Sequence, residues 1–173
     1  MNSVLPPDIT VVASEEASAG FHARYSAKWK RYCYNVVLNS GYDPFIRNFA
    51  WQMPDTILNV ESMNRAAAFL LGTHDFSFFR SSGSVQTSPI KTIYKAVWQE
   101  TAPGNLLFTI EGDGFLYRMV RNIVWNLTEV GLGRKSAACF KEELDSAGRH
   151  FKISPAPPQG LYLDYVGYTE YLR

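Results

Sequence analysis

The chain contains 173 residues, of which 46% are hydrophobic and 14% aromatic, and its formal net charge at pH 7 is +1. This length and composition support a buried core in one domain, or in one lobe of a larger protein, and argue against intrinsic disorder. No run of about 18 apolar residues occurs, so the sequence predicts no membrane-spanning helix. The near-neutral charge neither favours nor excludes a nucleic-acid partner.

Two features bear on the cellular compartment. The cysteines, Cys33 and Cys139, form no Cys-x-x-Cys motif and have no histidine cluster nearby, which argues against a metal site and a disulfide framework. Residues 1–8 lack the basic and then apolar layout of a signal peptide. We therefore expect a cytoplasmic protein with no membrane association and no metal.

In the first half of the chain, the short β-branched run Ile9–Ala13 predicts a brief strand. Residues 21–39 predict two extended segments, and the second, Arg31–Leu38, is rich in strand-forming residues. The spacing of apolar residues then changes to that of a helix over Val60–Leu71, for which Asn59 is a good N-cap.

The second half of the chain contains two further strand patterns, two helical patterns and a final strand pattern. The expected elements are strands over Ile90–Glu100 and Leu106–Glu111, a helix from about Leu116 to Gly131, a helix capped by Ser136 that runs to about Ala147, and a strand over Leu161–Tyr168. The order β-β-α-β-β-α-α-β predicts an α+β fold in which helices pack on one face of a mainly antiparallel sheet.

The helix that ends at Gly131 follows a Gly-Asp-Gly turn and has an apolar stripe for the core. The stripe consists of Leu116, Met119, Val120, Ile123, Val124, Leu127 and Val130. Arg121 lies off this stripe near Tyr117, and Arg118 and Trp125 lie close to the opposite side. A single arginine there is usually a surface charge, but two arginines and a tryptophan indicate a covered face, either a site or a subunit contact.

The sequence offers few candidates for a catalytic acid or nucleophile. Asp113 stands between two glycines, which is more typical of a turn than of a catalytic carboxylate. His74 and Asp75 are adjacent, and neighbouring residues rarely face each other, so Asp75 is expected to act as a local cap. No serine or cysteine lies in a nucleophile motif.

Basic and aromatic residues alternate near the first long strand. The basic residues are His22, Arg24, Lys28, Lys30 and Arg31, and the aromatic ones are Tyr25, Trp29 and Tyr32. Cations can neutralise phosphates and rings can stack on unpaired bases, so this pattern suits RNA. An ordinary strand, with aromatic side chains in the core and basic ones in water, explains the pattern equally well.

Six segments, taken together and in order, resemble the tRNA pseudouridine synthase A family. They are Asn2–Ile9, Phe21–Ala27, Arg31–Tyr34, Leu71–Ser77, Met119–Val124 and Gly160–Leu163. The resemblance implies isomerisation of uridine to pseudouridine in the anticodon stem-loop of tRNA, at tRNA positions 38–40. It also implies an aspartate nucleophile, no metal or organic cofactor, and a cytoplasmic homodimer as the full-length protein.

The resemblance also implies roles for individual residues. Tyr32 corresponds to the tyrosine that stacks on the target uracil and takes the proton from carbon 5, and Leu161 to the apolar residue that packs against the base. Arg121 corresponds to the arginine that pairs with the catalytic aspartate. The basic residues Arg24, Lys30 and Arg31 are expected to approach the RNA as part of the substrate-binding surface.

The family's nucleophile lies in a Gly-Arg-Thr-Asp-Ala-Gly motif, and that string does not occur here. We therefore expect residues 1–173 to be the C-terminal lobe of a synthase, without the N-terminal lobe that carries the aspartate, and to be inactive alone. Trp125 also departs from the family, which usually has a small residue at this position.

Two other interpretations stay open from the sequence. The first is a non-catalytic RNA-binding module with a sheet like that of an RNA-recognition motif, in which Tyr32 and its neighbours only stack on bases. The second is a structural or dimerisation domain, suggested by Trp125 on the side of the helix away from the core.

Overall fold

The computed structural model describes residues 1–38, 41–83, 88–146 and 154–171. Within these ranges the chain forms six strands and three α-helices. The strands are β1 (Trp29–Val37), β2 (Trp51–Gln52), β3 (Gly72–Asp75), β4 (Ile90–Ala102), β5 (Asn105–Gly112) and β6 (Leu161–Gly167), and the helices are α1 (Val60–Ala67), α2 (Met119–Gly131) and α3 (Ala137–Asp145). Asn39 and Ala147, two expected element ends, lie outside the described residues.

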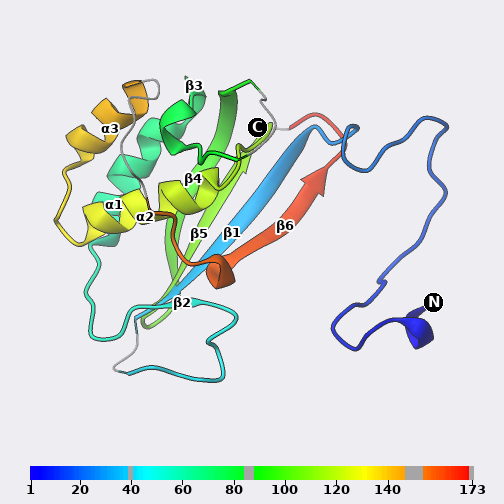
Figure 1. Cartoon of the computed structure of the whole chain (residues 1–173), viewed down its shortest axis with the longest axis horizontal. Helices are drawn as coiled ribbons and strands as arrows, with labels where there is room; N and C mark the ends of the chain where they lie inside the picture. The colour runs from blue at the N-terminus through cyan, green and yellow to red at the C-terminus, as the bar shows by residue number, and fades with distance from the viewer. Residues whose placement is uncertain (39–40, 84–87, 147–153, 172–173) are drawn as a thin grey trace.

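The strands form one sheet in the order β2-β1-β5-β4-β3, and β6 pairs with β1 as well. Every described pair is antiparallel except β1 with β2. Figure 1 shows the three helices on the same face of this sheet. The expected α+β fold, with helices on one face of a mainly antiparallel sheet, is confirmed.

The core lies between the sheet and the helices. Alternation along β5 turns Phe108 and Ile110 toward the helices, where both are fully buried. Helix α1 contributes Met63 to the same core, and the Asn59 side chain caps the helix by accepting a hydrogen bond from the Ser62 amide at 2.9 Å. A 3₁₀ turn, Ala68–Leu70, extends this helix to nearly the expected end.

Residues 1–28, called the N-terminal arm here, differ from the sequence prediction. Figure 1 shows that much of the arm runs away from the sheet. Ile9–Ala13 is not a strand, because Val11 bonds to the side chain of Asn2 rather than to a neighbouring strand. The first of the two extended segments is a turn, in which Nδ1 of His22 accepts hydrogen bonds from the amides of Arg24 and Tyr25. The second is β1.

Two strands were not expected from the sequence, and both are short. β2 has two residues and β3 has four, so neither shows a readable alternation of apolar and polar side chains. His74 and Asp75 therefore lie in a strand and not at a helix end.

Helix α2 is buried on more sides than its apolar stripe predicts. All seven stripe residues are buried, but so are Asn122, Asn126 and Thr128. Asn122 donates a hydrogen bond to the carbonyl of Phe79 at 2.7 Å, so a neighbouring segment covers this side of the helix. Backbone carbonyls also accept from two other buried polar side chains of this helix: Asn126 donates to the Asn122 carbonyl at 2.9 Å, and Thr128 donates to the Val124 carbonyl at 2.6 Å.

Trp125 has its partner within the chain. Its ring stacks on that of Trp51, with the centroids 5.7 Å apart and the planes 10° apart. Both rings are half-buried and pack against the core. The chain itself therefore covers Trp125, and this residue gives no support to a subunit contact.

Among the described residues, no helix is both long and apolar enough to cross a membrane.

Candidate active site

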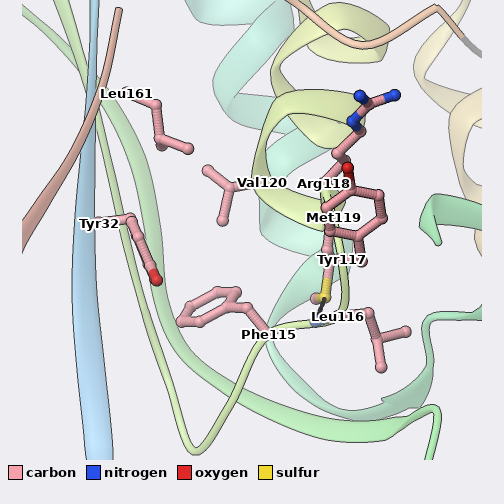
Figure 2. Close-up of a pocket in the computed structure, with 8 residues that line it drawn as sticks. All are labelled: Tyr32, Phe115, Leu116, Tyr117, Arg118, Met119, Val120 and Leu161. Carbon is pink, nitrogen blue, oxygen red and sulfur yellow. Dashed lines mark hydrogen bonds between the residues drawn. The ribbon is translucent and has the colours of Figure 1, made fainter. Parts of the chain in front are cut away.

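A cleft of about 260 Å³ opens where the start of α2 approaches β1 and β6. It is lined by Tyr32, Phe115, Leu116, Tyr117, Arg118, Met119, Val120 and Leu161. Figure 2 shows Tyr32 and Leu161 on one side of the cleft, with Phe115 and Val120 extending toward them from the other. The structure thus brings together Tyr32 and Leu161, two site residues predicted from segments far apart in the sequence.

Tyr32 lies in the middle of β1, on the same face as the fully buried Tyr34. Its ring meets the edge of Phe115 at 5.1 Å between centroids and an interplanar angle of 84°. Burial raises the pKa of the Tyr32 hydroxyl, so that the group is protonated at neutral pH. The hydroxyl forms no hydrogen bond with any residue that the structure describes, and it is available to a ligand in the cleft.

Leu161 is the first residue of β6 and follows a 3₁₀ turn, Pro158–Gly160. The turn is held against β1, because the Tyr34 hydroxyl donates a hydrogen bond to the carbonyl of Pro157 at 2.6 Å. Leu161 is paired with Tyr34 across the two strands. This pairing fixes an apolar side chain beside Tyr32.

Arg121 lies one residue after the cleft residue Val120, on the first turn of α2. Its Nε donates a hydrogen bond to the Ala156 carbonyl at 2.5 Å, and the Ala156 amide donates to the Arg121 carbonyl at 3.1 Å. Burial lowers the pKa of the guanidinium, and the positive charge of Arg118 lowers it further. No carboxylate in the described residues forms an ion pair with Arg121, and the partner of its side chain is the Ala156 carbonyl.

The two carboxylates that the sequence singled out are engaged with the backbone. Asp113 accepts a hydrogen bond from the Thr92 amide at 3.0 Å, and its own amide donates to the Thr92 carbonyl. Asp75 accepts from the Ser77 amide at 2.8 Å. Asp75 therefore acts in local backbone structure, as expected, whereas Asp113 bonds across to β4 rather than within its own turn.

Comparisons with known proteins show the family of the chain. Residues 66–169 match the family described as tRNA pseudouridine synthase. The tRNA pseudouridine synthase A of Thermoanaerobacter sp. (strain X514) is 46% identical over 169 residues, which cover 97% of this chain and 68% of that protein. The chain belongs to the tRNA pseudouridine synthase A family.

Two further members of the tRNA pseudouridine synthase A family show the same extent of similarity. The protein of Acetivibrio thermocellus is 44% identical over 168 residues, which cover 97% of this chain and 68% of that protein. The protein of Bacillus subtilis (strain 168) is 42% identical over 168 residues, which cover 97% of this chain and 67% of that protein.

In this member of the tRNA pseudouridine synthase A family, the basic residues predicted to approach RNA do not form one surface. Arg31 points to the opposite face of the sheet from Tyr32, where its Nε binds the buried Glu111 at 2.8 Å and its Nη1 lies 3.4 Å from Asp164. Lys30 is half-buried and shares the Tyr32 face. Arg24 is exposed in the arm, and its neighbour Ala23 bonds to Tyr168 just beyond β6.

Sequence reasoning did not select Phe115, and it noted Tyr117 and Arg118 only as residues off the apolar stripe of the helix, although all three line the cleft. The signal available in the sequence was the Gly-Asp-Gly turn immediately before an aromatic pair and a helix. This turn ends β5 and delivers Phe115 to the edge of the Tyr32 ring. The turn is therefore part of the site through the residues it positions.

Gly160 offers a test of how Leu161 is positioned in this tRNA pseudouridine synthase A family member. A Cβ atom at Gly160 would lie 2.7 Å from the Tyr34 ring and 2.8 Å from the Asn35 carbonyl oxygen. We expect Gly160→Ala to lower the free energy of unfolding by about 1–3 kcal/mol, because the overpacked backbone must move. Urea denaturation measures this loss.

Gly41→Ala is the matched control, because nothing lies within 4 Å of a Cβ atom built there. We expect its unfolding midpoint to stay close to that of the unmodified chain. Equal midpoints for the two variants would contradict the close approach of the 3₁₀ turn to β1.

Proposed function

We propose that this chain forms the base-binding part of a tRNA pseudouridine synthase, which isomerises uridine to pseudouridine in tRNA. The observation that carries the proposal is the cleft that combines Tyr32 and Leu161, with a partly buried Arg121 that has no described carboxylate partner. Membership of the tRNA pseudouridine synthase A family supports the same reaction.

The reaction breaks the glycosidic C–N bond, turns the uracil and forms a C–C bond through carbon 5. Carbon 5 loses a proton and N1 gains one, so the product is an isomer of the substrate. A nucleophilic carboxylate can form a covalent intermediate with the ribose or the base during these steps. The reaction involves no net oxidation or reduction, so it requires no oxidant or reductant.

Three of the cleft residues, Tyr32, Leu161 and Val120, have a proposed task. Tyr32 stacks on the uracil, and its oxygen, after losing its own proton to solvent, receives the carbon 5 proton as the phenolate. Leu161 and Val120 form apolar walls that keep competing water away from the base. A base in a stem-loop must leave its stack to enter such a cleft, as it does in other enzymes that modify bases.

Arg121 is proposed to bind the nucleophilic aspartate. A guanidinium beside a carboxylate keeps the carboxylate charged and can orient it through paired hydrogen bonds. The aspartate is proposed to lie in a separate lobe, outside residues 1–173, since Asp113 and Asp75 bind backbone amides and the family motif is absent. The first relative is longer than the match, which covers 68% of it.

We also propose which uridines are modified and how the full-length protein works. The target uridines are those of the anticodon stem-loop at tRNA positions 38–40, and the full-length protein works as a cytoplasmic homodimer without a cofactor. Arg24 and Lys30 contribute to the RNA-binding surface. Arg31 is proposed to act there only if it leaves Glu111, because the ion pair now holds it on the opposite face.

The alternative of a sheet like that of an RNA-recognition motif needs Tyr32 on an open sheet surface. Tyr32 instead lies on the face that the helices cover, and its ring packs against Phe115. The geometry therefore favours a base held in a cleft over bases spread on a sheet.

Mapping of pseudouridine tests the target assignment. Unmodified tRNA would be incubated with this chain together with the part of the Thermoanaerobacter protein that the chain does not match. Carbodiimide labelling and reverse transcription would then locate the product. We expect pseudouridine within the anticodon stem-loop, whereas product confined to other arms of the tRNA would contradict the assignment.

A further inference from the structure

Arg118 lines the cleft, and the proposed isomerisation of uridine assigns it no task. Figure 2 shows its side chain beside Tyr117, away from Tyr32 and Leu161. Its guanidinium carbon lies 5.0 Å from the centroid of the Tyr117 ring, and the residue is exposed. A cation held against an aromatic ring has a defined position and still faces solvent.

The backbone of Arg118 is held in an unfavourable conformation. Its φ of 59° lies in the left-handed region, which costs a residue other than glycine roughly 1–2 kcal/mol. Neighbouring bonds enforce this conformation: the Arg118 carbonyl accepts from the Asn122 amide at 3.0 Å, and the Tyr117 carbonyl accepts from the Ser81 amide at 3.1 Å. Such conformations are concentrated at functional sites.

The charges around the cleft leave Arg118 without a counterion. Its charge lowers the pKa of Arg121, so the two guanidinium groups are within electrostatic reach of each other. The first turn of α2 contains no acidic residue, and no ion pair to Arg118 is present in the described residues. A single incoming carboxylate would neutralise Arg121 and leave Arg118 for a second anion.

We propose that Arg118 binds a backbone phosphate of the RNA next to the uridine that enters the cleft. The proposal rests on the proposed function, which supplies an anionic ligand whose base lies at Tyr32. A phosphate must lie near any base inserted there, and guanidinium groups bind phosphate through two parallel hydrogen bonds. Arg80 is a second exposed cation near this site, because it precedes Ser81, whose amide bonds to the Tyr117 carbonyl.

The test measures binding of an anticodon stem-loop RNA to the 173-residue chain at several salt concentrations. Arg118→Asn removes the charge but suits the left-handed backbone, so the variant should keep its fold. We expect its affinity to fall about three- to tenfold at low salt. The slope of log affinity against log salt should shrink by about 0.7–0.9, the value for one lost phosphate contact.

Two variants complete the test. Arg118→Lys keeps a positive charge and should retain the slope of the unmodified chain. Arg65→Gln removes an exposed arginine of α1 that pairs with Glu61, and should leave binding unchanged. An Arg118→Asn slope equal to that of the unmodified chain would overturn the role of Arg118 alone. Failure of the unmodified chain to bind the stem-loop would overturn the proposed function and this inference with it.

Discussion

Arg121→Ala is expected to reduce pseudouridine formation about 10²- to 10³-fold in the chain supplemented with the complementary part of a relative. Removing one member of a buried charge pair typically costs about 3–5 kcal/mol, and each 1.4 kcal/mol corresponds to a factor of ten. Arg121 suits this role because it is partly buried and has no other described carboxylate. Tritium release from RNA labelled at carbon 5 of uridine measures the rate.

The pH dependence of the rate distinguishes loss of the pair between Arg121 and the aspartate from a merely structural effect of the substitution. In the unmodified protein Arg121 would hold the pKa of the aspartate low, so activity is kept at acidic pH. In Arg121→Ala the acidic limb of the rate profile should move to higher pH. Arg134→Gln, which removes an exposed arginine that pairs with Glu129, is the control and should leave both rate and profile unchanged.

Loss of the Arg121 side chain also removes its hydrogen bond to Ala156. Arg121→Lys keeps the charge but not the planar fork, so we expect activity between those of the unmodified protein and Arg121→Ala. If Arg121→Ala folds normally and keeps full activity with an unmoved profile, the proposed pairing is wrong.

Substitution of Tyr32 is expected to have the second large effect on pseudouridine formation. Tyr32→Phe keeps the ring that packs on Phe115 but removes the hydroxyl, so KM should change little while kcat falls about 10²-fold or more. Tyr32→Ala also removes the stacking surface and should raise KM. Steady-state kinetics with anticodon stem-loop RNA separates the two parameters.

Burial raises the pKa of Tyr32 above its usual value near 10, so little phenolate exists at neutral pH. If the phenolate receives the carbon 5 proton in the slow step, kcat should rise with pH between about 7 and 10 and lose this rise in Tyr32→Phe. Tyr34→Phe is not a suitable control because its hydroxyl holds Pro157, so Tyr42→Phe, an exposed tyrosine, serves instead. An unchanged kcat in Tyr32→Phe would show that Tyr32 only stacks on the base and does not receive the proton.

The long elements of the fold were predictable from their length and local composition. β1, β4 and β5 are long and rich in strand-forming residues, and α2 follows a stripe of seven apolar residues at helical spacing. Residues 9–13 have the same β-branched character but no neighbouring strand, so local propensity alone gave the wrong answer there.

The site was only partly predictable. Tyr32, Leu161 and Arg121 were named from the family motifs. The pairing of β1 with β6 brings Tyr32 and Leu161 to one cleft, whereas Arg121 is not among the lining residues of that cleft and bonds to Ala156. The partner of Trp125 was not predictable, because Trp51 lies in a two-residue strand far away in the sequence. The ion pair of Arg31 with Glu111 was not predictable either, since it depends on a strand register that the sequence does not reveal.

The most direct test of the account is tritium release from tRNA labelled at carbon 5 of uridine, measured with three preparations. These are the chain alone, the chain with the unmatched part of the Thermoanaerobacter protein, and the same pair with the aspartate expected in the family's Gly-Arg-Thr-Asp-Ala-Gly motif changed to asparagine. We expect tritium release only with the second preparation. Release by the chain alone would contradict a nucleophile supplied from outside residues 1–173, and no release by any preparation would contradict the proposed synthase.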